Sequence, residues 1–150
     1  MVKEAYEIII VEDNSNDAEL MIRSLKQNNL ANSITLLEDG EQAIDYIFNQ
    51  GKYEKNDLKY TRLVIFLDLK LPKIDGLEVL EKIRSNSKTK TIPVIIVTSS
   101  KEDPDVTAAY KLGANSYVVK PVNYNDFVDT INRLGVYWLV VNENPHEDGK

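Results

Sequence analysis

The sequence contains no cysteine and only one histidine among its 150 residues. A chain without thiols forms no disulfide, no thiolate nucleophile and no cysteine-ligated zinc site. The one histidine, His146, lies in a polar segment near the C-terminus, so we expect neither histidine-based acid–base catalysis nor a histidine metal site. The lack of cysteine and the position of the one histidine therefore exclude enzymes and metal centres that depend on these residues.

Long apolar runs and basic runs are also missing from the sequence. No window approaches the length of a membrane span, and residues 1–6 lack the apolar core of a signal peptide. Acidic residues outnumber basic ones by 24 to 18, and no run of lysine and arginine has the length of a nucleic-acid-binding arm. We therefore expect a soluble, cytoplasmic protein that binds neither a membrane nor nucleic acid.

Short apolar runs rich in β-branched residues alternate along the chain with segments of helical periodicity. Such runs, bounded by turn residues, are typical of strands buried on both faces of a parallel sheet. They predict strands at residues 8–11, 34–37, 64–67, 94–97 and 116–119. Apolar residues three and four positions apart predict a helix after each strand. The pattern favours an α/β fold: a doubly wound, five-stranded parallel sheet of order 2-1-3-4-5, the flavodoxin-like (βα)5 arrangement.

The length of the chain suits one compact domain spanning residues 1–150. We expect its core to cover about residues 6–138, with residues 139–150 as a C-terminal tail. Residues 49–62 are polar and have no apolar period, so they predict a loop longer than most connections of this kind. The apolar residues 137–141 either complete the core or form an interaction patch, and the second alternative would allow a homodimer.

Polar residues stand where four of the predicted strands end. Glu12 and Asp13 follow the first strand and Asp68 follows the third, while Thr98 ends the fourth and Lys120 follows the fifth. The carboxyl ends of parallel strands meet at one edge of the sheet, which is where open α/β sheets bind their ligands. We therefore expect these residues, distant in the chain, to converge into one site.

The chemistry of the converging residues indicates an aspartyl-phosphate site. Three neighbouring carboxylates repel one another and raise each other's pKa unless a cation neutralises them. Mg²⁺ fits best, because it takes carboxylate oxygens as ligands and bridges to phosphate oxygens. Lys120 can reach Asp68 or a phosphoryl group on it, and Thr98 offers a hydroxyl to the same oxygens. Asp68 is then the nucleophile, with the metal and the lysine neutralising charge.

The chain resembles the receiver domain of two-component response regulators over essentially residues 6–138. The resemblance is carried by short motifs in a fixed order: Val-Glu-Asp-Asn at 11–14, Leu-Asp at 67–68 with Leu-Pro at 71–72 and Asp-Gly at 75–76, Val-Thr-Ser at 97–99, and Tyr-Val-Val-Lys-Pro at 117–121. Each motif is weak alone, and together they are specific. The 49–62 loop and the 137–139 ending resemble the stand-alone regulators paired with phytochrome-type sensor kinases.

The resemblance implies a phosphorylation chemistry and its cofactor. It implies that Asp68 accepts a phosphoryl group from a histidine kinase, phytochrome-type in the narrower resemblance, from a phosphotransfer protein or from a small phosphodonor. Mg²⁺ would be held by Glu12, Asp13, Asp68 and the backbone carbonyl of Lys70, and Lys120 would pair with the phosphoryl group. The implied catalysis is limited to phosphoryl acceptance and slow autodephosphorylation of the protein itself.

The resemblance also implies a conformational switch. Thr98 would move toward the phosphoryl group and Tyr117 would turn inward, which would alter the surface of the fifth strand and its flanking helices for a downstream protein target. The peptide bond between Lys120 and Pro121 resembles one that is cis in the family.

Two other functions compete with this interpretation. Haloacid-dehalogenase-like phosphatases also form an aspartyl phosphate, but they need a second acid two residues after the nucleophile, where this chain has Lys70. A degenerate receiver could act as a constitutive binding module, although all the chemical residues are present here. Taken one by one, Glu12 and Asp13 could merely cap a helix, and Tyr117 could be a packing residue.

Overall fold

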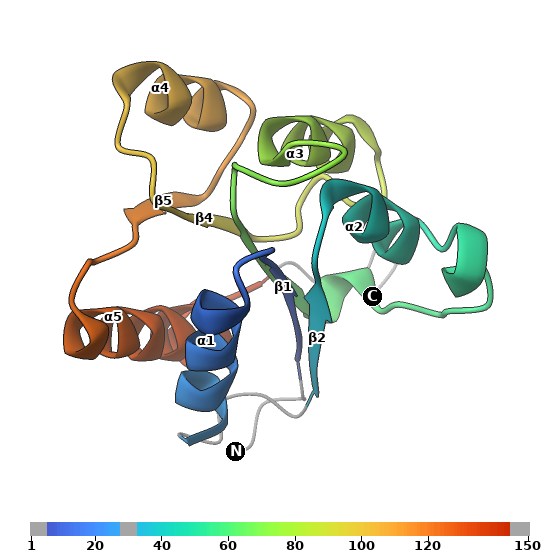
Figure 1. Ribbon diagram of the computed structural model, residues 1–150. Helices are drawn as coiled ribbons and strands as arrows, with labels where there is room; N and C mark the ends of the chain where they lie inside the picture. The colour runs from blue at the N-terminus through green and yellow to red at the C-terminus, as the bar shows by residue number, and fades with distance from the viewer. Residues whose placement is uncertain (1–5, 28–32, 145–150) are drawn as a thin grey trace.

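The computed structural model describes residues 6–27 and 33–144, and in this part of the chain five parallel strands form one sheet in the order β2-β1-β3-β4-β5 (Figure 1). The predicted fold class and strand order are confirmed. The strands are β1 (Glu7–Val11), β2 (Ser33–Leu37), β3 (Leu63–Leu67), β4 (Val94–Thr98) and β5 (Ser116–Val119). The longer helices are α1 (Ser15–Gln27), α2 (Gly40–Ile47), α3 (Gly76–Ser85), α4 (Asp103–Lys111) and α5 (Tyr124–Val136).

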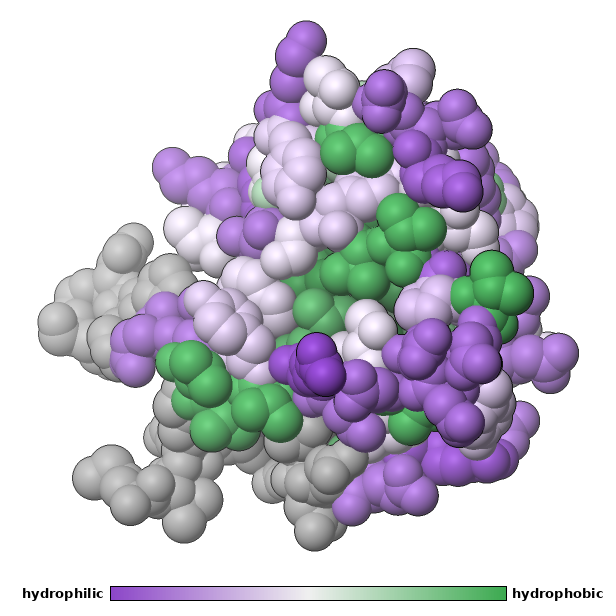
Figure 2. Space-filling view, turned by 90° about the vertical axis from the view of Figure 1, so that its left-hand side faces the viewer, coloured by the Kyte–Doolittle hydropathy of each residue, from purple (hydrophilic) through white to green (hydrophobic). Residues whose placement is uncertain are grey.

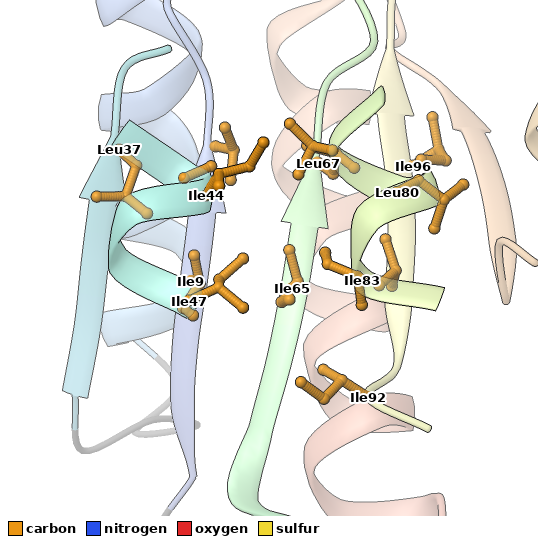
Figure 3. Close-up of a cluster of buried hydrophobic side chains, with 14 of the residues drawn as sticks. Ile9, Leu37, Ile44, Ile47, Ile65, Leu67, Leu80, Ile83, Ile92 and Ile96 are labelled. Carbon is orange, nitrogen blue, oxygen red and sulfur yellow. The ribbon is translucent and has the colours of Figure 1, made fainter. Parts of the chain in front are cut away.

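The helices cover the sheet in two layers, α1 and α5 on one face and α2, α3 and α4 on the other (Figure 1). Because strand side chains alternate between faces, each central strand supplies both cores. Ile9, Ile65 and Ile96 pack beneath α2 and α3 (Figure 3), whereas Ile8 and Phe66 pack beneath α1 and α5. Burial on both faces explains why these strands read as uninterrupted apolar runs.

The strands are in register at the end where the polar residues follow. Val11 of β1 lies opposite Leu67 of β3, and Leu67 lies opposite Ile96 of β4. The residues after Val11 and Leu67 therefore leave the sheet at the same level. This register places Glu12 and Asp68 side by side at the carboxyl edge.

Glycine is required at the start of α3, close to Asp68. A Cβ atom at Gly76 would lie 2.2 Å from the carbonyl oxygen of Asp68 and 2.7 Å from the Cα atom of Leu69. Asp75 caps the helix, because its side chain accepts a hydrogen bond from the backbone N–H of Glu78 at 3.0 Å. The Asp-Gly pair thus lets α3 begin directly against the loop that carries Asp68.

Residues 49–62 contain two short 3₁₀ turns, Gly51–Tyr53 and Tyr60–Arg62, where the sequence predicted only a loop. The Tyr60 hydroxyl donates to the carbonyl of Ile47 at 2.7 Å, and the Tyr53 ring stands edge-on to Tyr46. A single 3₁₀ turn is too short to show an apolar period, which is why the pattern did not reveal these turns.

The last helix continues past Val136 as a π-helical turn, Tyr137–Val141. Trp138 and Leu139 are buried in the core shared with α1 and α5, so the packed chain extends beyond the expected boundary at 138. The part of the expected tail beyond 144, with His146, lies outside the described residues, as do residues 28–32. Within the described ranges, no helix combines the length and apolarity needed to cross a membrane.

The peptide bond between Lys120 and Pro121 is trans, so the expectation of a cis bond is wrong for this structure. The trans form is favoured by about 0.5–1 kcal/mol before a proline. The backbone N–H of Lys120 donates to the carbonyl of Thr98 at 2.7 Å, which holds the end of β5 against β4.

Candidate functional site

The strand-end residues meet at the carboxyl edge of the sheet. Glu12, Asp13 and Asp68 each offer a carboxylate oxygen, and these atoms all lie within 4.8 Å of one another. Lys120 reaches the same place from β5, with its ammonium nitrogen 2.9 Å from the Asp68 carboxylate. Four of the predicted residues, from three strands, therefore form one cluster.

Asp68 is nearly buried, with 7% of its side chain exposed, and both of its carboxylate oxygens have partners. One oxygen accepts from the Lys120 ammonium, and the other accepts from the backbone N–H of Lys70 at 3.2 Å. The backbone N–H of Asp68 donates to Val11 at 3.1 Å, which continues the pairing of β1 and β3 by one residue. These contacts fix the direction in which the carboxylate faces.

Glu12 is the most deeply buried acid of the cluster. One of its carboxylate oxygens lies 2.7 Å from the Lys120 ammonium, and the other accepts from the backbone N–H of Asn14 at 3.1 Å. Burial raises the pKa of Glu12 to about 7, although the hydrogen bond from Lys120 acts in the opposite direction, and the charge of Asp68 adds to the rise. A nearby cation would therefore favour the ionised form of Glu12.

Asp13 is the exposed member and opens the cluster to solvent. It lines a surface cleft together with Lys70, Pro72, Asp75 and Asp105. The donor set consists of carboxylate oxygens, which hard divalent cations prefer, and its three negative charges exceed the single positive charge of Lys120. The residues present therefore fit a divalent metal ion that would enter from the Asp13 side.

The Lys120 ammonium contacts a third carboxylate, which does not belong to the residues at the strand ends. It lies 2.9 Å from Asp17 in the first turn of α1, as well as near Glu12 and Asp68. Burial acts to lower the pKa of Lys120, but the hydrogen bonds to the three carboxylates outweigh it and raise this pKa above its usual value. Lys120 is thus a charged lysine at the centre of the site.

In the sequence, Asp17 follows the first strand among other residues of helix-capping type, Asn14, Ser15 and Asn16. Its contact with Lys120 joins positions 103 residues apart, so local spacing could not reveal it. The available signal was Asn14, whose side chain accepts from the backbone N–H of Asp17 and so caps α1. That cap places Asp17 in the first turn, beside the strand ends.

Thr98 and Tyr117 lie beside the cluster, and the side chains of both form hydrogen bonds with Ser100, in the loop after β4. Thr98 is fully buried, and its hydroxyl oxygen accepts weakly from the backbone N–H of Ser100 at 3.4 Å. The Tyr117 hydroxyl donates to the Ser100 carbonyl at 2.8 Å, and burial raises the pKa of this phenol. Tyr117 is therefore tied to the loop that follows Thr98.

The same loop is linked to the mouth of the site through Asp105, in the first turn of α4. Asp105 accepts a hydrogen bond from the Ser100 hydroxyl, which lowers the pKa of this carboxyl group. The exposed Lys70 side chain reaches the same carboxylate at 3.4 Å. The backbone N–H of Lys70 therefore faces the site, whereas its side chain faces α4.

Comparisons with known proteins agree with this geometry. The family model of the response regulator receiver domain matches residues 8–132. The probable methanogenesis regulatory protein FilR2 of Methanothrix harundinacea is 37% identical over 138 residues, which cover 92% of this chain and 86% of FilR2. Response regulator Rcp1 of Synechocystis sp. is 36% identical over 132 residues, which cover 88% of each chain.

Solved structures share the fold at similar identity. The crystal structure of the Mn²⁺-bound form of Rcp1 aligns with a TM-score of 0.87 at 35% identity, over 94% of this chain and 99% of Rcp1. The phosphorylated cyanobacterial phytochrome response regulator RcpA aligns with a TM-score of 0.89 at 30% identity, over 95% of this chain and all of RcpA. The resemblance to phytochrome-linked regulators is thereby confirmed, and the chain belongs to the response regulator receiver domain family.

Proposed function

We propose that this protein is a phosphorylation-dependent signalling switch in which Asp68 accepts a phosphoryl group. One observation carries the proposal: the nearly buried Asp68 carboxylate faces the Lys120 ammonium at 2.9 Å and shares a 4.8 Å cluster with Glu12 and Asp13. A carboxylate held beside a lysine and a divalent-cation donor set is suited to nucleophilic attack on a phosphorus atom.

In the proposed reaction an Asp68 oxygen attacks the phosphorus of the donor, and the bond from phosphorus to the leaving group breaks with its electron pair. Lys120 neutralises charge on the transferred oxygens, and Thr98 donates its hydroxyl to them. Glu12, Asp13, Asp68 and the Lys70 carbonyl would hold Mg²⁺, which supplies positive charge for the phosphoryl group when bound. Water later attacks the phosphorus, which releases inorganic phosphate and restores the Asp68 carboxylate.

The proposed phosphodonor is a histidine kinase, of the phytochrome type, or a phosphotransfer protein. Membership of the receiver family supports the first part, because receivers act with such kinases in two-component signalling. The likeness to RcpA, a phytochrome response regulator, supports a kinase of the phytochrome type. On this proposal the only catalysis is phosphorylation and dephosphorylation of Asp68 itself.

The proposed output is a protein-binding surface on α4, β5 and α5. Figure 2 shows apolar atoms gathered on this face of the molecule. Tyr110, Val119, Val122 and Tyr124 are the large apolar side chains exposed on α4, on β5 and at the start of α5. Movement of Thr98 and of the Tyr117-bound loop would reshape this face for a downstream protein target.

The extension of α5 provides a second exposed apolar area, where a homodimer would form on this proposal. Val136, Tyr137, Val140 and Val141 are each 43–61% exposed there. Val136, Tyr137 and Val141 line a shallow hollow there, together with Asn132 and Arg133.

Mass spectrometry after incubation with Mg²⁺ and acetyl phosphate tests the function. We expect the parent to gain the mass of one phosphoryl group and Asp68→Asn to gain none. The matched control is Asp129→Asn, because Asp129 is an exposed carboxylate that pairs with Arg133 on α5, and it should behave as the parent. The same mass gain in Asp68→Asn as in the parent would show that Asp68 is not the acceptor.

Two further measurements address the alternatives and the partner. Saturable hydrolysis of an added phosphomonoester would favour a phosphatase, and undetectable Mg²⁺ binding in a titration would favour a degenerate receiver. A phosphotransfer screen against the histidine kinases of the same genome would identify the donor.

A further inference from the structure

Asp17 differs from the other two carboxylates that hold Lys120. Glu12 and Asp68 follow strands and belong to the carboxylate cluster, whereas Asp17 lies on α1. The Asp17 side chain is 26% exposed, against 2% for Glu12 and 7% for Asp68. Among the contacts of the described residues, the Asp17 carboxylate reaches the site through Lys120, from its rim.

Three carboxylate oxygens surround the Lys120 ammonium, and it donates hydrogen bonds to Asp17 and Asp68. An ammonium group has three N–H donors and no acceptor. Oxygens of Glu12, Asp17 and Asp68 lie 2.7, 2.9 and 2.9 Å from the nitrogen. The N–H that Lys120 donates to Asp17 can turn to a new phosphoryl oxygen only if this hydrogen bond weakens.

The charges identify the contact that opposes the reaction. Phosphoryl transfer places new negative oxygens beside Asp68, and Lys120 is the cation that the chain itself supplies there. Asp17 places another negative charge beside the same ammonium group. Asp17 does not belong to the three acids that fit a metal ion. It therefore competes with the phosphoryl group for Lys120 without helping to bind the metal directly.

We propose that Asp17 is a positioning residue that restrains Lys120 in the unphosphorylated protein and thereby slows phosphorylation of Asp68. This inference rests on the proposed function of Asp68. In the transfer step the bonds that form and break are those at phosphorus, and Asp17 only releases one N–H of Lys120 to a phosphoryl oxygen. Because Asp17 lies in the first turn of α1, its release also frees the start of that helix from β5.

The test uses Asp17→Asn, which keeps the size of the side chain and removes its charge. With acetyl phosphate at saturating Mg²⁺, we expect its phosphorylation rate to rise roughly threefold to tenfold, the effect of weakening one charge-assisted hydrogen bond. Asp17→Glu restores the charge and should return the rate to within about twofold of the parent. The control Glu19→Gln removes a charge from the same helix, where Glu19 pairs with Arg23, and should leave the rate unchanged.

A second readout is independent of phosphorylation. In the metal-free protein, the NMR signal of the Lys120 ammonium group should shift in Asp17→Asn and stay in place in Glu19→Gln. An unshifted signal in Asp17→Asn overturns the proposed restraint. A shifted signal with an equal or slower phosphorylation rate, in a variant that unfolds at the parent's temperature, shows that Asp17 does not compete with the phosphoryl group. If the parent itself is not phosphorylated, the proposed function fails, and the NMR experiment still reports on the contact.

Discussion

Two glutamates at the two ends of β1 show how surroundings decide the behaviour of a residue type. Glu12, after the end of the strand, is buried among other carboxylates beside Lys120, and burial raises its pKa to about 7. Glu7, at the start, accepts hydrogen bonds from the hydroxyls of Thr35 and Tyr46. Glu12 therefore belongs to the site, whereas Glu7 joins β1 to β2 and α2.

A pH titration should detect the contact between Tyr46 and Glu7. Burial, together with the hydrogen bond to Glu7, raises the pKa of Tyr46 from 10 to about 12. The folded protein thus keeps this phenol protonated at pH values where the unfolded chain has lost the proton. The stability that this group contributes is present below pH 10 and is lost as the pH rises from 10 to 12.

The measurement is the difference in phenolate absorbance between the parent and Tyr46→Phe, with circular dichroism to follow folding. We expect a midpoint near 12 in the folded protein. Glu7→Gln should bring the midpoint down, because it removes the charged acceptor. A midpoint near 10 in the parent would contradict the burial and hydrogen bonding described for Tyr46.

At the scale of elements, Arg84 at the end of α3 joins three connections on the side of the sheet away from the site. Its guanidinium donates to the carbonyl of Ile92 before β4, to the carbonyl of Gly113 after α4 and to the side chain of Asn115 before β5, each at 2.8 Å. Burial lowers the pKa of Arg84, and the neutral acceptors satisfy its donors. This residue therefore fixes α3 and α4 relative to β4 and β5.

Replacing Arg84 with lysine should destabilise the protein. An ammonium group cannot reproduce the planar fork that reaches three acceptors in different directions. We expect Arg84→Lys to lower the free energy of unfolding by roughly 2 kcal/mol, measured by urea denaturation. Arg133→Lys is the matched control, because Arg133 is exposed and pairs only with Asp129 one turn away among the contacts described, and it should change stability by less than about 0.5 kcal/mol. Equal effects of the two substitutions would argue against the role assigned to Arg84.

At the scale of the whole molecule, the sheet brings like charges together. The chain carries a formal net charge of −6, and its topology places Glu12, Asp13 and Asp68 within 4.8 Å. Lys120 offsets the repulsion between these carboxylates without neutralising it fully. The fold is therefore expected to gain stability from any ligand that adds positive charge at this edge.

Mg²⁺ should accordingly stabilise the protein against heat. A ligand that binds only the folded state at a hundred times its dissociation constant adds about 2.7 kcal/mol to the free energy of unfolding. Differential scanning calorimetry with increasing Mg²⁺ should show a rising Tm for the parent and for Asp129→Asn. Asp13→Asn should lose most of the rise, because it removes the charge of the solvent-facing carboxylate of the proposed metal site. A full rise in Asp13→Asn would place the metal elsewhere.

Much of the architecture was predictable because it depends on local periodicity. Apolar runs located each strand, helical spacing located each helix, and the right-handed crossover rule restricted their order. The strand-end residues Glu12, Asp13, Asp68 and Lys120 could be assigned to one site, because parallel strands end at a common edge. The π-helical turn after Val136 and the two 3₁₀ turns in 49–62 were missed, because such short elements leave no periodic signal.

By itself, the sequence determined the fold class, the order of the sheet and the acids that gather after β1 and β3, since these follow from patterns read along the chain. Only the tertiary structure decided which donors and acceptors meet. The contact between Asp17 and Lys120 and the hydrogen bond from Tyr117 to Ser100 depend on how α1, β4 and β5 pack. The physical reason is that a contact between residues far apart in the chain depends on how the helices and strands that carry them pack against each other. No local sequence pattern encodes that packing.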